Sequence, residues 1–254
     1  MTGIQRQLRI CLALLAAGWL SNVQAAPLIW NGGDAGIWSS GGTGWMSGSS
    51  PASWSDFDTA VFTGTPPLSV SITTPVKAAS ISVSGSSYIL NGPAQMERSG
   101  ADWHVADPVT NTVTAPLTGT NGLTKSGGGI LMLTGTNKTF TGSVAVTGGA
   151  LRITTASAGS LGPAATTAII LDGGELQTLF TANTTVNYAM TPGPLGGTLR
   201  NLGNDSQRFT LASQTLRGSG TVTLAFGTQN TRFVMGTTAQ TNFTGRWIID
   251  SGGN

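Results

Sequence analysis

Short runs of alternating apolar residues, separated by glycine-rich turns, recur along most of this chain. Residues 123–142 read LTKSGGGILMLTGTNKTFTG, in which a glycine run precedes an alternating apolar stretch and a polar turn follows it. A period of two is typical of strands that turn one face inward. Similar runs occupy residues 68–74, 78–85, 143–154, 167–178 and 220–227. No amphipathic helix separates these runs, so the sequence predicts an all-β sandwich, barrel or β-solenoid.

Self-similarity favours the solenoid among these three folds. NKTFTGSVAVTGGA (137–150) is echoed by QTNFTGRWIIDSGGN (240–254), and each combines Phe-Thr-Gly, a four-residue strand and a Gly-Gly turn. The interval between Phe140 and Phe243 leaves room for four or five rungs of roughly 20–25 residues. Stacked rungs bury aliphatic side chains that no single rung could bury alone. The side chains expected to point inward are Leu131, Leu133, Val144, Val146, Leu151 and Ile153.

Composition agrees with this prediction. The chain has 254 residues, of which 37 are glycine, 9% are charged and one is histidine. A chain with so much glycine and so little charge suits tight turns between strands better than helices.

Residues 117–153, LTGTNGLTKSGGGILMLTGTNKTFTGSVAVTGGALRI, resemble the autotransporter-associated β-strand repeat, also called the passenger-associated transport repeat. Residues 205–254 resemble a second, degenerate copy. The resemblance implies a right-handed parallel β-helix that Gram-negative-type bacteria export and display or release as a passenger. Ile130 and Met132 stand where the repeat usually has Thr, and Phe140 stands where Tyr is common.

The N-terminal residues 1–25 have the pattern of a cleaved secretory signal. Arg6 and Arg9 precede the apolar run ICLALLAAGWL, and small residues stand at Val23 and Ala25. This run is shorter than the roughly 20 residues that span a bilayer, although a retained anchor is the alternative. Cleavage after Ala25 would remove the only cysteine and two of the 12 basic residues, which leaves the basic residues equal in number to the 10 acidic ones. No basic patch for nucleic acid is therefore expected.

Residues 26–66 are expected to form a Trp-rich leader that caps the first rung, with residues 67–254 forming the β-helix. Trp30, Trp38, Trp45 and Trp54 follow one another closely in this leader. We expect them to cover the open end of the solenoid, and stacking on sugars is the alternative. The second copy stops at Asn254 just where another strand should follow. This predicts a truncated fragment or a short relative, and a translocator barrel encoded downstream or absent.

If the second copy follows the first, Trp247 and Ile249 take the inward positions of Val144 and Val146. We expect this last rung to be frayed or sticky, because no polar cap is visible in the residues after it.

Two motifs suggest chemistry and are better explained as structure. Lys125 precedes the glycines of TKSGGG, whereas a phosphate-binding loop places its lysine after them and before a helix. The single histidine, His104, lies near Asp102 and Asp107 in sequence, and we expect it in a surface loop. With one histidine and no cysteine in the mature chain, a metal site is not expected.

Carboxylate pairs deserve separate consideration because parallel β-helices also host polysaccharide lyases and hydrolases, and hydrolysis needs two carboxyl groups roughly 5–10 Å apart. The candidate pairs are Asp56/Asp58, Asp102/Asp107 and Asp172/Glu175. Side chains two apart in a strand face one side, so the first pair could converge. The alternative is a solvated turn before a strand. We assign no catalytic, cofactor-binding or metal-binding residue.

The leading hypothesis is a secreted or surface-exposed, non-enzymatic β-helical passenger segment that serves as a stalk or adhesion surface. Its partners would be glycans or proteins on host or neighbouring cells, with no nucleic acid and no cofactor. The rivals are a glycan-active lyase or hydrolase, which predicts carboxylates clustered on one face, and a truncated fragment of a longer autotransporter.

Overall fold

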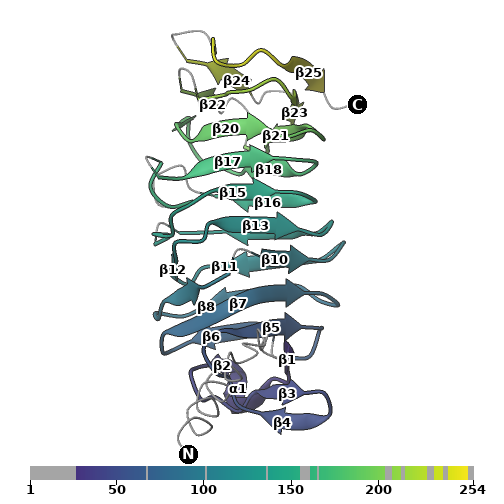
Figure 1. The fold of residues 1–254 in the computed structure, drawn as a ribbon, viewed down its shortest axis with the longest axis vertical. Coiled ribbons are helices and arrows are strands. Elements are labelled where there is room, and N and C mark those ends of the chain that lie inside the picture. Colours follow the sequence, from purple (N-terminus) through teal and green to yellow (C-terminus); the bar gives the residue numbers. More distant parts are fainter. Residues whose placement is uncertain are drawn as a thin grey trace, which may run out of the picture.

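The chain forms an elongated coil of stacked strands in a computed structural model (Figure 1). The structure describes residues 27–66, 68–100, 102–135, 137–154, 161–164, 166–203, 208–212, 215–227, 232–236 and 240–250. The expected signal segment 1–25, with Cys11 and the cleavage site after Ala25, lies outside these residues. Within the described ranges the only helix is the four-residue α1 (Gly33–Gly36), and no helix there has the length and apolar character needed to cross a bilayer.

The first sheet has 12 strands and runs along one face of the coil. Its order is β20-β17-β15-β13-β10-β7-β5-β1-β3-β4, with β9 and β12 joined at its side through β7. The strands are β1 (Pro27–Trp30), β3 (Trp45–Ser47), β4 (Ser50–Ala52), β5 (Asp58–Phe62), β7 (Val76–Val83), β9 (Met96–Arg98), β10 (Asp102–Val105), β12 (Leu117–Thr118), β13 (Leu123–Ser126), β15 (Val144–Val146), β17 (Ala168–Leu171) and β20 (Ala189–Pro192).

The second sheet has 10 strands in the order β2-β6-β8-β11-β14-β16-β18-β21-β23-β25. They are β2 (Ile37–Trp38), β6 (Ser69–Ile72), β8 (Tyr88–Asn91), β11 (Thr110–Val113), β14 (Ile130–Leu133), β16 (Ala150–Ile153), β18 (Glu175–Thr178), β21 (Gly197–Asn201), β23 (Thr221–Phe226) and β25 (Arg246–Asp250). A third sheet joins β19 (Thr184–Val186), β22 (Arg208–Leu211) and β24 (Arg232–Met235) in that order.

Successive rungs pair in parallel, which confirms the solenoid and excludes the sandwich and the barrel. Leu131 of β14 lies in register with Leu151 of β16, and Leu151 lies in register with Leu176 of β18. The sequence separations of these paired leucines match the expected rung length. The six side chains expected to point inward are all at most 1% exposed: Leu131, Leu133, Val144, Val146, Leu151 and Ile153.

Glycines form tight turns at which the backbones of neighbouring rungs approach each other closely. Gly149, between β15 and β16, has a φ of 55°, and a Cβ there would lie 2.3 Å from the carbonyl oxygen of Gly129 on the neighbouring rung. Only glycine combines a left-handed backbone with such close approach. The Gly-Gly turns seen in the sequence are therefore corners of the coil.

Four tryptophans fill the N-terminal end of the coil. Trp30, Trp38, Trp45 and Trp54 are at most 1% exposed, and their rings meet edge-on or tilted at centroid distances of 4.8–5.3 Å. The hairpin of β3 and β4 pairs antiparallel with β1, in contrast to the parallel rungs that follow. The cluster is buried inside this end, as a covering role requires, and presents no exposed ring to a sugar.

The strand that follows the Phe-Thr-Gly motif belongs to a different sheet in each of the two sequence copies. Phe140 precedes β15 in the first sheet, whereas Phe243 precedes β25 in the second sheet. Trp247 and Ile249 are in register with the buried Val222 and Leu224, which places them on the inward side of β25 as expected, although they are 37% and 71% exposed on this last described rung. They lie in the second sheet, however, and not in the first-sheet positions of Val144 and Val146. Because the rungs differ in length, the second copy of the motif lies at a different place around the coil from the first. Alignment of the two motifs alone cannot detect this difference.

Candidate ligand-binding groove

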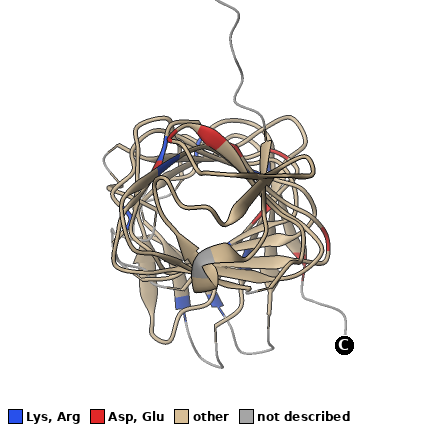
Figure 2. Cartoon of the chain, turned by 90° about the horizontal axis from the view of Figure 1, so that it is seen from below, with Lys and Arg blue, Asp and Glu red and all other residues tan. Residues whose placement is uncertain are grey.

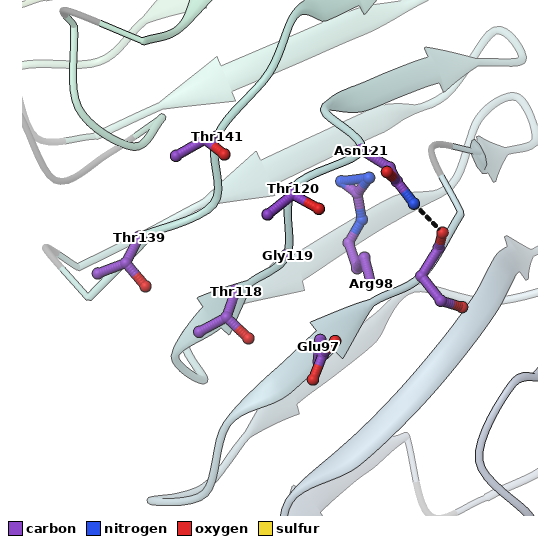
Figure 3. Close-up of a pocket in the computed structure, with 9 residues that line it drawn as sticks. Glu97, Arg98, Thr118, Gly119, Thr120, Asn121, Thr139 and Thr141 are labelled. Carbon is purple, nitrogen blue, oxygen red and sulfur yellow. Dashed lines mark hydrogen bonds between the residues drawn. The ribbon is translucent and has the colours of Figure 1, made fainter.

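An outward-facing groove of about 440 Å³ crosses three rungs where β9 and β12 lie side by side (Figure 3). Glu97 is in register with Thr118, and the bridge between Leu117 and Lys138 places Thr139 beside Thr118 on the next rung. Alternate residues of a strand share a face, so a second column runs beside the first. One column is Glu97, Thr118 and Thr139, and the other is Ser99, Thr120 and Thr141.

The floor between the two columns is Gly119. Its φ is 126°, and a Cβ at this position would lie 2.5 Å from the carbonyl oxygen of Arg98. Any other residue would therefore strain the backbone and clash with the backbone of Arg98 on the neighbouring rung. On the inner side, the guanidinium carbon of Arg98 lies 5.8 Å from the ring centroid of Phe140, which is two rungs away. This contact closes the coil beneath the glycine.

The charged groups of the groove are engaged within the protein. The Glu97 carboxylate pairs with Lys77 at 3.1 Å. The Arg98 side chain is 4% exposed and donates hydrogen bonds to the carbonyl oxygens of Gly100 and Gly122. Burial lowers the pKa of Arg98 to about 10, an effect that Asp102 opposes, so this guanidinium keeps its charge near neutral pH. The hydroxyl groups of the two columns are thus the groove's principal outward polar groups.

The first candidate carboxylate pair, Asp56 and Asp58, serves a turn rather than a shared centre. Asp58 accepts a hydrogen bond from the backbone of Ser55 at 2.9 Å, and Asp56 accepts one from the backbone of Lys77 at 3.1 Å. Phe57, between them, has a positive φ of 75°. Both carboxylates stabilise the turn before β5, as the solvated-turn alternative predicts.

The two carboxylates of the third pair, Asp172 and Glu175, also have separate partners. Asp172 accepts a hydrogen bond from the backbone of Leu195 at 2.8 Å. Glu175 pairs with Arg200 at 2.7 Å and accepts a further hydrogen bond from Gln177. The pairing with Glu175 raises the pKa of Arg200. This ladder of charged and amide groups stabilises the outer face of the second sheet.

His104 lies on β10 and is exposed, not in a loop as expected. Its Nδ1 lies 3.3 Å from the hydroxyl of Ser126 on the neighbouring strand. No hydrogen bond joins His104 to Asp102 or Asp107 in the part of the chain that the structure describes.

Among the described residues, no group of three or more histidine, cysteine and acidic residues is arranged to hold a metal ion. Figure 2 shows that charged residues occupy few, scattered positions around the coil.

Two lysines are buried in the wall of the coil, which the sequence pattern did not indicate. The Lys125 ammonium donates to the carbonyl oxygens of Ser126, Gly127 and Gly148 at 2.7, 2.8 and 3.1 Å. The Lys138 ammonium donates to those of Ala115 and Thr134, both at 2.9 Å. The turn carbonyls thus provide hydrogen-bond partners for the two buried ammonium groups. The glycines beside Lys125 form a turn, and no helix follows them.

We expect the folded chain to become more stable as the pH rises from 8 towards 10. Burial lowers the pKa of both Lys125 and Lys138 to about 8, from an ordinary value of 10.5. Above pH 8 the folded chain releases these protons while the unfolded chain keeps them, so stability rises with pH. The gain should be roughly 1–3 kcal/mol for the two lysines together, because the carbonyl acceptors offset part of the burial cost.

This gain should end near pH 10 because burial raises the pKa of Tyr88 and Tyr188 above 10.0. The unfolded chain then loses tyrosine protons that the folded chain retains, which lowers stability as the pH rises further. Urea unfolding at intervals from pH 7 to 11 measures the profile. Lys125→Met should reduce the rise, and a flat profile in the unsubstituted chain would show that the lysines release no protons on folding in this window.

The stacked parallel strands make this chain a β-solenoid, the fold that the resemblance to autotransporter passengers implied. Its sequence is 34% identical over 227 residues to the adhesin BmaC autotransporter of Brucella suis biovar 1 (strain 1330). This similarity confirms the resemblance to autotransporter passengers. The alignment covers 88% of this chain and 6% of the length of that protein. No family model matches the chain, and no solved structure matches it.

Proposed function

We propose that this chain is a surface-exposed or secreted passenger segment that adheres to molecules on other cells. The observation that carries the proposal is the similarity of nearly the whole chain to a segment of an autotransporter adhesin. The solenoid supports it, because a rigid stack of rungs presents a long polar face while its apolar side chains stay in the core. Export through the N-terminal signal, with cleavage after Ala25, is part of this proposal.

The partners we propose are glycans or proteins on the surface of host or neighbouring cells. An adhesive role needs an accessible outer face and no reacting groups. The carboxylates of two candidate pairs hold turns and ion pairs, so the described residues favour adhesion over glycoside hydrolysis.

Adhesion can be measured with beads that carry the mature chain. We expect several times more coated beads than albumin-coated beads to stay attached to cultured mammalian epithelial cells after washing. Beads coated with the Leu133→Asp chain, after circular dichroism has shown that this chain is unfolded, serve as the matched control, because they present nearly the same composition without the fold. Equal attachment of the folded and unfolded chains would contradict an adhesive function of the solenoid.

A further inference from the structure

We propose that the groove over β9 and β12 binds an uncharged oligosaccharide, an inference that rests on the proposed adhesive function and names its ligand. Two columns of side chains from three consecutive rungs line the groove, and four of its residues are threonines: Thr118, Thr120, Thr139 and Thr141. Its volume of about 440 Å³ lies within the range of sites for small ligands.

The chemistry of the lining matches a polyhydroxylated ligand. Each threonine hydroxyl can both donate and accept a hydrogen bond, which is also true of each hydroxyl of a sugar. Rungs are spaced about 4.8 Å apart, so the hydroxyl groups of Thr118 and Thr120 recur one rung further on in Thr139 and Thr141. A chain of sugar rings could therefore meet equivalent hydroxyls on successive rungs.

An extended peptide is a poorer fit to this surface. Peptides usually add to a sheet through the backbone of a free edge, or anchor apolar side chains in pockets. The groove offers no free edge, because Leu117, Thr139 and Thr141 already take part in backbone hydrogen bonds between rungs. Its walls carry hydroxyl, carboxylate and amide groups beside the small methyl groups of the threonines, and the Phe140 ring is 1% exposed on the inner side. A ligand in the groove would therefore form its hydrogen bonds mainly with side-chain hydroxyl groups.

The charges of the groove favour a neutral ligand over an acidic one. Lys77 neutralises Glu97 at the rim, and backbone carbonyls hold the Arg98 guanidinium. An acidic saccharide would bring its negative charge close to Glu97 without meeting a cation that is free to pair with it. Burying an uncompensated charge costs more than burying a hydroxyl that finds a partner. We therefore assign the ligand to the neutral oligosaccharides.

The test is titration of the full folded chain with maltohexaose, cellohexaose, N-acetylated chitohexaose and a heparin-derived hexasaccharide, followed by saturation-transfer NMR. We expect at least one neutral probe to bind with a dissociation constant on the order of 1 mM or tighter. The double variant Thr118→Val/Thr139→Val removes two hydroxyls and keeps β-branched side chains, and it should weaken binding roughly tenfold or more.

Thr185→Val/Thr210→Val is the matched control, because these two threonines are also in register on neighbouring strands, outside the groove. This control should bind as the unsubstituted chain does. Binding of heparin alone, binding of no neutral probe, or equal weakening in both double variants would overturn the inference. If the groove variant adheres to cells as well as the unsubstituted chain does, this inference fails and the adhesive function stands. If beads coated with the unsubstituted chain do not attach to the cells, the adhesive function itself is refuted.

Discussion

Leu133→Asp is expected to unfold the coil or to lower its free energy of unfolding by more than about 4 kcal/mol. Leu133 is fully buried on β14, in register with Val113 and Ile153 on the two neighbouring rungs. An aspartate there would place a carboxylate among aliphatic side chains, where burial of a charge is costly. In a solenoid each rung contacts only its neighbours, so one such change damages two interfaces.

Met132→Asp provides the matched control, one residue away on the same strand. Met132 points outward and is in register with Thr112 and Arg152. We expect a loss below about 1 kcal/mol there, because the new carboxylate stays hydrated beside a cation. Urea unfolding followed by far-UV circular dichroism measures both variants. Equal losses at the two positions would mean that the inward and outward faces of β14 are assigned wrongly.

Trp45→Ala has the second largest expected effect, a loss of roughly 3–5 kcal/mol. Trp45 is fully buried and its ring lies 4.8–5.6 Å from those of Trp30, Trp38, Trp54 and Phe62. Removing it would leave a cavity at the centre of the aromatic cluster and expose the first rung. Because the cluster joins the terminal hairpin to the coil, we also expect this end to exchange its amide hydrogens faster.

Trp247→Ala is the comparison, since it removes the same side chain from a position that is 37% exposed. Its main aromatic contact is with Phe243, at a centroid distance of 5.0 Å. We expect a loss of about 1 kcal/mol or less. If the two tryptophan variants are equally stable, the buried cluster does not hold the N-terminal end together.

The sequence pattern was sufficient for the parts of the fold that depend on local periodicity. Leu131, Leu133 and Leu151 alternate with outward residues, and a period of two assigns their face whatever the rung length. The tryptophan cluster could be anticipated because the open end of a solenoid needs a cover, and four large apolar rings near that end can supply it. The Gly-Gly turns were likewise recognisable as corners.

The groove could not be predicted from local pattern because it depends on register between rungs. A signal was nevertheless present: Glu97-Arg98-Ser99, Thr118-Gly119-Thr120 and Thr139-Phe140-Thr141 follow one another at equal intervals in the sequence. Later rungs are longer, so the copy at Phe243 is displaced to another sheet although its motif is intact. Register between rungs is a property of the stacked coil, which a motif comparison does not measure.

Competition between soluble and bead-bound chain tests the adhesive function most directly, because it separates saturable binding from general stickiness. Excess soluble folded chain is predicted to reduce the attachment of coated beads to epithelial cells to the level of albumin-coated beads. The soluble Leu133→Asp chain, added at the same concentration, should leave attachment unchanged. If the folded chain does not compete, or if the unfolded chain competes equally well, the solenoid is not an adhesion surface for these cells.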